Sequence, residues 1–401
     1  MNVNSKPSSF FKKFSSLFFG LVLVQIINFL FSLVLPKYFS PSQFAEFGIF
    51  TSIVFILIEV NNAKLDIAVM LGKTTEEAKK IVSACFTFAI LFSLALLIIQ
   101  ALFLLFLPKI YLLVSIVVFL YGIHQPILVY LNKIEQYKTI NTFRIIQVLI
   151  TCIATILLAI QNVNHALILG FTAGLVVATL YSLLFFKLSF SISNLREIWK
   201  QYDQFPKYGT WSSLLNNISR NSIPVLLTQF FSTQLVGFYS YSTRLLNAPT
   251  GMYTSALSQV YFKTASEQND TELRKSTQKI ILLTFAIAII PTLVLLFFGK
   301  DIFYLLFSGE WLEAGKITQY LILWYFLGVI ISPISSLLDI KNKLKFEFGY
   351  NLTLFITRIG AILIGGLLND FYIAILLFVA IGIIMNLYLL YYINFVILKH
   401  D

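Results

Sequence analysis

The sequence predicts an all-α membrane protein whose chain crosses the bilayer about twelve times. Two observations predict this class: long apolar stretches alternate with short linkers, and most of the positive charge collects in every second linker. An α-helix needs about 20 apolar residues to cross the ~30 Å hydrocarbon layer, because lipid offers the backbone no hydrogen-bond partner. The composition agrees, since 58% of the 401 residues are hydrophobic and only 12% are charged.

The expected spans leave no room for a separate water-soluble domain. We expect the first apolar run to be a retained span, because it is too long for a signal-peptide core and no small-residue cleavage site follows it. The linker 191–207 divides the chain into a six-helix lobe at 1–190 and a second at 208–401, around a central cavity. The spans are expected at 16–35, 44–62, 81–107, 110–131, 141–161, 166–187, 208–230, 236–262, 278–299, 315–338, 347–368 and 371–397.

A short internal sequence repeat indicates that the two lobes are related. The run YFSPSQF at 38–44, with Phe47 three residues on, resembles FFSTQL at 230–235, with Phe238 three residues on. The offset is about half the chain. Duplicated halves that enclose a central site are the usual architecture of transporters built from repeats.

The distribution of Lys and Arg predicts the orientation. Cytoplasmic linkers retain basic residues because these residues resist translocation. With the N-terminus inside, 22 of the 29 basic residues fall on the cytoplasmic side and only Lys37, Lys109, Lys300 and Lys316 fall outside. Both termini are therefore expected in the cytoplasm. The cytoplasmic set is Lys6, Lys12, Lys13, Lys64, Lys73, Lys79, Lys80, Lys133, Lys138, Arg144, Lys187, Arg196, Lys200, Lys207, Lys263, Arg274, Lys275, Lys279, Lys341, Lys343, Lys345 and Lys399.

Several other functions are disfavoured by the composition. The net charge of +11 is scattered through linkers and is not gathered on one surface, which argues against nucleic acid as a partner. Cys85 and Cys152 both lie in apolar runs, where a thiol behaves as a small hydrophobe. His124 and His165 are isolated at or near span ends. No metal set, nucleotide-binding loop or cofactor motif is recognised.

Polar side chains inside the spans indicate the functional region. A charge near the bilayer centre costs at least ~2.5–3.5 kcal/mol, so it must face a partner or a wet cavity. Three arginines lie within spans, and nearby polar residues follow them at helical spacing, whereas Glu46, Glu59, Asp66 and Asp339 lie near span ends. A net-positive cavity is therefore expected. The candidate binding residues are Arg220, Arg244, Arg358, Asn216, Asn217, Gln25, Asn28 and Tyr241.

Excess guanidinium charge suits an anionic ligand, because the planar fork binds phosphate or carboxylate oxygens through two parallel bonds. The amides and the tyrosine hydroxyl suit sugar hydroxyls. A ligand with both a phosphate and a glycan would use both sets. Elsewhere, Gly170, Gly174 and Ala178 recur every fourth residue and predict a close helix contact.

With these residues in view, the chain resembles the bacterial O-antigen and polysaccharide lipid flippases of the multidrug/oligosaccharidyl-lipid/polysaccharide exporter superfamily. The matching pieces run in family order from the first span to the tenth. They are LPKYFSP at 35–41, FAEFG at 44–48, KLDIAV at 64–69, EEA at 76–78, VGFYS at 236–240, Arg244 with Leu245, SQV at 258–260 and GEWLEAG at 309–315.

The resemblance implies two six-helix lobes that alternate between inward-facing and outward-facing states. It implies a flippase that moves undecaprenyl-pyrophosphate-linked oligosaccharide across the bacterial inner membrane, in contact with membrane lipid and beside a polysaccharide polymerase and a chain-length regulator. No enzyme activity and no cofactor are implied. The family often has an acidic residue just before the arginine of the seventh span, where this chain has Ser219.

Two other classes remain open at this point. A cation-coupled multidrug exporter on the same scaffold would need a carboxylate deep in a lobe, and the carboxylates here cluster at span ends. A membrane polysaccharide polymerase would need a sizeable outer loop with an acid and a base. The longest outer linker, 300–314, holds Asp301, Glu310 and Glu313 without a histidine.

Overall fold

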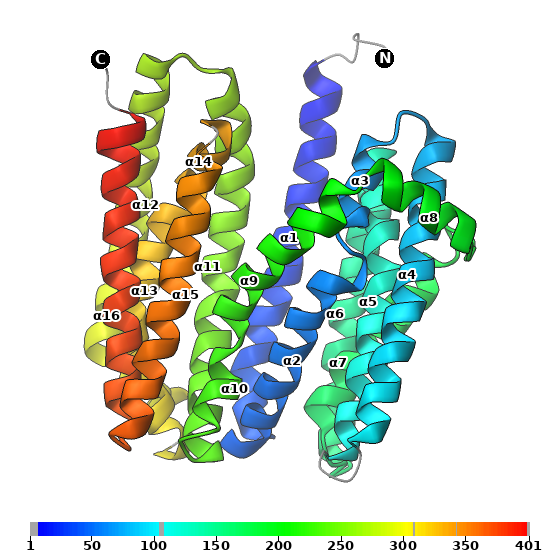
Figure 1. The fold of residues 1–401 in the computed structure, drawn as a ribbon. Coiled ribbons are helices and arrows are strands. Elements are labelled where there is room, and N and C mark those ends of the chain that lie inside the picture. Colours follow the sequence, from blue (N-terminus) through cyan, green and yellow to red (C-terminus); the bar gives the residue numbers. More distant parts are fainter. Residues whose placement is uncertain (1–6, 104–107, 308, 342, 399–401) are drawn as a thin grey trace. The chain divides into compact units, whose positions relative to one another are not determined.

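A computed structural model describes residues 7–103, 108–307, 309–341 and 343–398, and all regular structure in these ranges is helical (Figure 1). This confirms the all-α class. The α-helices are α1 Pro7–Val34, α2 Pro41–Asn61, α3 Leu65–Leu71, α4 Thr75–Leu102, α5 Leu113–Lys133, α6 Tyr137–Ile160, α7 Ala166–Ser182, α8 Ile192–Gln201, α9 Thr210–Asn221, α10 Ile223–Leu227, α11 Thr233–Glu267, α12 Asp270–Phe307, α13 Leu312–Ile334, α14 Leu337–Ile340, α15 Leu344–Leu367 and α16 Phe371–Tyr392. Short 3₁₀ or π turns occupy Leu35–Lys37, Lys109–Leu112, Phe205–Gly209, Gly309–Trp311 and Ile393–Ile397.

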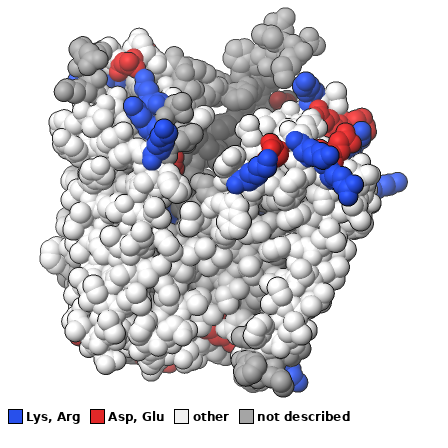
Figure 2. All heavy atoms as spheres, viewed as in Figure 1, with Lys and Arg blue, Asp and Glu red and all other residues white. Residues whose placement is uncertain are grey.

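Nine helices of the described chain are long and apolar enough to cross a membrane. The other three expected spans correspond to α7, which is shorter, to α11, and to the segment of α9 and α10. In the view of Figure 2 the charged side chains gather toward the ends of the helices, and the flanks between them are uncharged. The chain is therefore a polytopic membrane protein, and the count of twelve crossings stays a prediction.

The helix expected through 208–230 is not continuous. The chain makes a π turn at Phe205–Gly209, continues as α9 to Asn221, and restarts as α10 at Ile223. Pro224 lies at the second position of α10, where its missing N–H is not needed, and its ring disfavours helical geometry in the residue before it. The break follows from this proline and from the polar composition of α9.

The helices form two compact units. Unit 1 comprises Met1–Asn28 and Phe47–Ser222, and unit 2 comprises Phe29–Glu46 and Ile223–Asp401. Both α1 and α2 are therefore divided: most of each helix belongs to unit 1, and the end of α1 and the start of α2 belong to unit 2. The expected division into six and six helices around a central cavity, with a linker at 191–207, stays a prediction.

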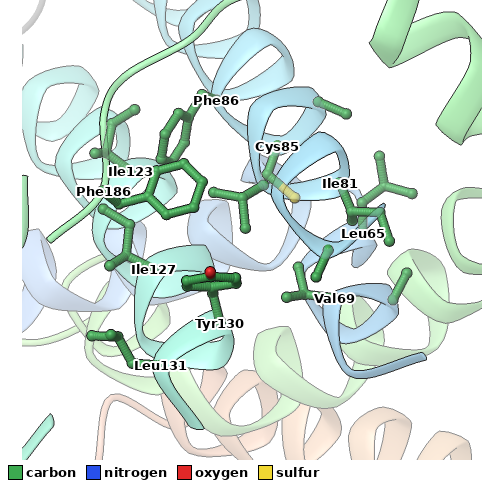
Figure 3. Close-up of a cluster of buried hydrophobic side chains, with 14 of the residues drawn as sticks. Leu65, Val69, Ile81, Cys85, Phe86, Ile123, Ile127, Tyr130, Leu131 and Phe186 are labelled. Carbon is green, nitrogen blue, oxygen red and sulfur yellow. The ribbon is translucent and has the colours of Figure 1, made fainter. Parts of the chain in front are cut away.

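Unit 1 has an apolar core between α3, α4, α5 and the segment after α7 (Figure 3). Phe186 lies with its ring 5.7 Å from that of Phe86 and 5.2 Å from that of Tyr130. Ile123 and Ile127 of α5 complete the cluster beside them. This core attaches the segment after α7 to α4 and α5.

The expected close contact at the glycines of α7 is confirmed. A Cβ atom on Gly170 would lie 2.0 Å from the hydroxyl oxygen of Thr155, and one on Gly174 would lie 2.0 Å from that of Thr151. Both threonines belong to α6. Only glycine lets the two helix backbones approach this closely.

In unit 2, α13 packs against α11, α12 and α16, and α15 packs along α16. The start of α2 joins this unit through Phe44, whose ring lies 4.9 Å from Tyr241 and 5.3 Å from Trp311. The backbone of Pro41 also lies against Gly237 of α11. These contacts explain why residues 29–46 belong to unit 2.

Candidate functional site

A buried arginine held between two aromatic rings is the centre of the candidate site in unit 2. Arg358 of α15 is 6% exposed. Its guanidinium carbon lies 4.9 Å from the ring centroids of both Trp324 on α13 and Phe378 on α16. The cation–π attraction, worth ~2 kcal/mol per ring in a dry site, offsets part of the cost of removing this charge from water. Three helices therefore hold the guanidinium in a fixed place.

Polar groups of α11 and α13 extend this site. The hydroxyl of Tyr325 donates to Oδ1 of Asn247 at 3.0 Å, and Tyr325 lies within electrostatic range of Arg358. Asn247 is exposed, and Arg244, one turn earlier on α11, is half-buried. Unit 2 thus combines two guanidinium groups with an amide and phenol hydroxyls, which is the set expected for an anionic, hydroxyl-rich ligand.

The polar residues of α9 lie in unit 1. Arg220 is exposed near the end of this helix. Nδ2 of Asn221 donates to Oδ1 of Asn217 at 2.9 Å, and Asn217 also lies 3.5 Å from the carbonyl of Ser213. These bonds orient the amide of Asn217 along the helix. The side chain of Asn216 lies outside the described part of the chain.

The polar residues expected on the first span also belong to unit 1. Gln25 and Asn28 are both half-buried on α1, and Asn28 is the last residue of α1 in that unit. Five residues before Gln25, the backbone of Gly20 lies against the side chain of Asn141 from α6. A role for Gln25 and Asn28 in binding stays a prediction.

Tyr241 is enclosed in the packing of unit 2. Its side chain is fully buried, and its hydroxyl donates to the backbone carbonyl of Ser32 at 3.0 Å. Its ring lies 4.7 Å from Trp311 and 5.6 Å from Phe307. The three-residue spacing from Arg244 suggested a shared polar face, but the aromatic partners of α12 and the Gly309–Trp311 turn surround the ring. We therefore leave Tyr241 out of the proposed binding set.

Four residues of the site were missed by the sequence analysis, namely Trp324, Tyr325, Asn247 and Phe378. Trp324 and Tyr325 form an adjacent pair in the middle of an apolar helix, and Asn247 follows Arg244 by three residues. The sequence did contain an indication of these residues. Tryptophan and tyrosine usually lie at the membrane interfaces, so a pair of them far from a span end suggests another role. Hydropathy alone could not show that the pair frames Arg358.

Arg144, which the sequence analysis counted with the cytoplasmic charges, lies inside α6. It falls in the third turn of α6, half-buried, and its Nη1 has no hydrogen-bond partner among the described residues. His124 of α5 lies within its electrostatic range and is 2% exposed. Unit 1 therefore places a half-buried arginine near a buried histidine, which the sequence did not indicate.

We expect His124→Phe to stabilise the protein. Both ring nitrogens of His124 are buried and have no hydrogen-bond partner within the described chain, and the ring lies 6.0 Å from that of Phe143. An unsatisfied buried polar group costs about 1–3 kcal/mol, so an aromatic ring without nitrogens should raise the melting temperature in detergent. His124→Gln is the control, because it keeps a polar group and should give no gain. A lower melting temperature for His124→Phe contradicts this account.

Two carboxylates of unit 1, those of Glu59 and Asp66, lie at the junction of α2 and α3. Glu59 pairs with Lys64 at 2.5 Å. Burial raises the pKa of Asp66, and the nearby charge of Lys64 opposes this shift. No group of three or more His, Cys, Asp or Glu suited to a metal ion occurs in the residues that the structure describes. Glu59 is thus engaged by Lys64, and Asp66 lies within electrostatic range of the same lysine.

The chain is similar to known proteins of polysaccharide assembly and lipid transport. Residues 34–316 match the family model described as "Polysaccharide biosynthesis protein". The lipopolysaccharide biosynthesis protein WzxC of Escherichia coli K12 is 26% identical over 165 residues, which cover 40% of this chain and 34% of that relative. The match thus spans about a third of the relative's length.

Solved structures share the fold. The lipid II flippase MurJ in an inward closed conformation superposes with a TM-score of 0.74 at 17% identity, covering 94% of this chain and 87% of that chain. An inward-facing multidrug resistance transporter of the MATE family gives a TM-score of 0.64 at 14% identity, covering 91% and 92%. At these identities the likeness shows a common fold. Since the family model covers most of the sequence, this membrane protein belongs to the polysaccharide biosynthesis protein family.

Proposed function

We propose that this protein is a flippase that moves undecaprenyl-pyrophosphate-linked oligosaccharide from the inner to the outer face of the bacterial plasma membrane. The observation that carries the proposal is the guanidinium of Arg358, fixed between Trp324 and Phe378 inside apolar helices. The family to which the chain belongs supports the glycan part of the proposal.

The physical problem is to move a charged, sugar-bearing head group past hydrocarbon. An isolated charge or an unpaired hydroxyl transferred to an apolar medium is strongly disfavoured. A fixed guanidinium replaces the lost hydration of a phosphate through two charge-assisted bonds. Arg358 and Arg244 of unit 2 and Arg220 of unit 1 are the cations that we assign to this task.

The oligosaccharide needs hydrogen-bonding groups in addition to cations. Asn247 and Tyr325 form a bonded pair beside Arg358, and Asn217 presents an amide on α9. We assign these groups, with Asn216, Gln25 and Asn28, to the sugar hydroxyls. The polyprenyl tail stays in the lipid, because the outer flanks of the helices are apolar and offer it no competing polar site.

The proposed setting follows from the same substrate. Both termini lie in the cytoplasm, and the two lobes expose the head group to one face and then to the other. A polysaccharide polymerase with its chain-length regulator consumes the flipped repeat units. A multidrug exporter on the same scaffold is the alternative, and it would export a cationic dye without changing surface glycan.

Complementation tests the proposal directly. We expect the gene for this chain to restore surface glycan to a strain that lacks its own flippase and to clear the lipid-linked repeat units trapped on the cytoplasmic face. We expect Arg220→Ala to lower glycan export about tenfold or more, since a hydrogen bond to a charged group contributes about 1.5–3 kcal/mol.

The control for this variant is Arg274→Ala, which removes an exposed arginine near the start of α12. It should export normally at equal protein level. If the protein exports dye and the amount of trapped repeat units does not change, the drug-exporter alternative is supported and the flippase proposal is contradicted. Full export by Arg220→Ala would remove Arg220 from the binding set.

A further inference from the structure

The segment between α7 and α8 exposes a row of large apolar side chains. The span expected to continue to 187 ends instead at Ser182, and the chain then runs without regular helix to Ser191. Leu184 is 76% exposed and Ile192 is 68% exposed. The exposed apolar residues are Leu184, Phe185, Leu188, Phe190 and Ile192, and the exposed Lys187 lies among them.

Hydrogen bonds to α4 fix the depth of this segment. The hydroxyl of Ser83 donates to the carbonyl of Ser189 at 2.9 Å. The backbone N–H of Ser191 donates to the hydroxyl of Thr87 at 2.9 Å. Together with the packing of Phe186 on Phe86 (Figure 3), these bonds place residues 186–191 beside the third and fourth turns of α4.

The same turns of α4 lie at the membrane boundary. The helix has 28 residues, which makes it about 42 Å long against a hydrocarbon thickness of ~30 Å. About eight residues must therefore project. The charged residues of α4, which are Glu76, Glu77, Lys79 and Lys80, all lie in its first six positions, so the projecting end is the N-terminal one. The hydrocarbon then begins close to Ser83.

Helix α8 runs from this boundary along α4, toward the end of α4 that projects from the membrane. Its apolar face is already occupied, since Ile198 is buried and the ring of Trp199 lies 5.4 Å from that of Phe88. At its end, Nε2 of Gln201 donates to the carboxylate of Glu77 at 2.8 Å, and the hydroxyl of the next residue, Tyr202, donates to the same carboxylate at 3.0 Å. Helix α8 thus runs from the level of Thr87 to the projecting start of α4.

The exposed face of α8 is apolar at the start of the helix and basic toward its end. Ile192, Arg196 and Lys200 are spaced four residues apart and are all exposed, so they follow one another along the helix. Ile192 lies at the boundary, and the two basic residues lie above it. The nearby carboxylates do not cancel this charge. Glu76 pairs with Lys79 and Glu77 is held by the end of α8, while Glu197 is the only acidic residue among 184–200 and stands against Lys187, Arg196 and Lys200.

We propose that residues 184–200 form a membrane-interface anchor that binds anionic phospholipid head groups. The apolar side chains of 184–192 enter the edge of the hydrocarbon. Lys187, Arg196 and Lys200 reach the phosphates, as long basic side chains do at membrane surfaces. The anchor fixes unit 1 and its link to α9 at a set depth in the bilayer, and it does not depend on which substrate the protein carries.

Lipid binding by the purified full-length chain tests the charge part of the proposal. The probes are fluorescent phosphatidylglycerol and fluorescent phosphatidylcholine, titrated in detergent micelles. We expect the wild type to prefer phosphatidylglycerol and the variant Lys187→Gln/Arg196→Gln/Lys200→Gln to lose that preference. Each basic residue near an anionic surface contributes ~1 kcal/mol, so the loss should approach a hundredfold.

The matched control removes three exposed lysines elsewhere in the chain, in the variant Lys37→Gln/Lys109→Gln/Lys300→Gln. Lys37 and Lys109 lie in 3₁₀ turns and Lys300 lies near the end of α12. It should keep the preference for phosphatidylglycerol. An equal loss in both variants would show that only the total charge matters and would overturn the proposal. An unchanged preference in the first variant would overturn it as well.

A depth measurement tests the apolar part. A fluorophore is attached to Ile192→Cys or to Glu197→Cys, each in a Cys85→Ala/Cys152→Ala background, and the protein is placed in liposomes with phosphatidylglycerol. We expect phospholipids brominated on their acyl chains to quench the label at 192 strongly and the label at 197 weakly. Equal quenching at the two positions would contradict an interface boundary at Ile192. Neither measurement involves glycan export, so its outcome is independent of the flippase proposal.

Discussion

Arg358→Ala is expected to abolish glycan export while the protein stays folded in the membrane. The side chain is 6% exposed and its guanidinium lies between two rings, so it is held in place before the ligand arrives. Removing one partner of a buried charge pair costs about 2–5 kcal/mol, which corresponds to a fall in head-group affinity of about 30-fold to several thousandfold. Surface glycan and trapped lipid-linked repeat units are the measurements.

The stability of this variant separates binding from folding. Loss of the cation–π contacts with Trp324 and Phe378 is offset by removal of a charge that had to be desolvated. We therefore expect a melting temperature in detergent close to that of the wild type. A variant that unfolds would give Arg358 a structural role, and a variant that exports normally would remove it from the proposed site.

Arg358→Lys provides the finer control. It keeps the positive charge but loses the planar fork that lies against both rings and binds two oxygens at once. We expect a level of glycan export between the levels of the wild type and of the alanine variant. Full export by the lysine variant would show that a point charge suffices and that the ring contacts of Arg358 do not matter for transport.

Gly237→Ala is expected to destabilise unit 2 strongly. A Cβ atom on Gly237 would lie 1.8 Å from the carbonyl oxygen of Pro41, and this neighbour is backbone that cannot rotate away. The start of α11 would have to separate from the start of α2. That movement would disturb the contacts of Phe44 with Tyr241 and Trp311. Forcing atoms into a packed contact costs about 1–3 kcal/mol or more, and we expect the upper end of that range here.

The matched control is Gly251→Ala on the same helix. A Cβ atom there would meet nothing within 4 Å, so the substitution should be neutral or stabilise α11 by up to about 1 kcal/mol through the better helix propensity of alanine. Thermal unfolding and the monodisperse fraction on gel filtration compare the two variants. Equal melting temperatures would contradict the close approach of α2 and α11.

The two variants also differ in what they test. Arg358→Ala addresses chemistry at the proposed site, whereas Gly237→Ala addresses the attachment of the first helices to unit 2. That attachment was not expected from the sequence, where residues 29–46 fall in the first lobe. The structure assigns them to unit 2, and the ring contacts of Phe44 supply the physical reason.

The sequence by itself determined that this is an all-helical membrane protein and located most of its spans. Runs such as 81–107 and 371–397 are decisive because hydrocarbon offers no hydrogen bonds, so an apolar run of that length must be a helix whatever its neighbours are. The family resemblance rested on short motifs between 35 and 315, and the family match confirms it. Arg358 was found from its charge alone.

Only the tertiary structure decided which way each polar side chain faces. Tyr241 and Arg244 share a helical face by spacing, yet Tyr241 is enclosed by aromatic rings, and Trp324 frames Arg358 from another helix. The surroundings of a side chain depend on which helices pack around its own, and those partners are distant in the sequence. Hydropathy reports how a segment partitions between water and lipid, but it does not report how a helix is rotated or where a proline ends it.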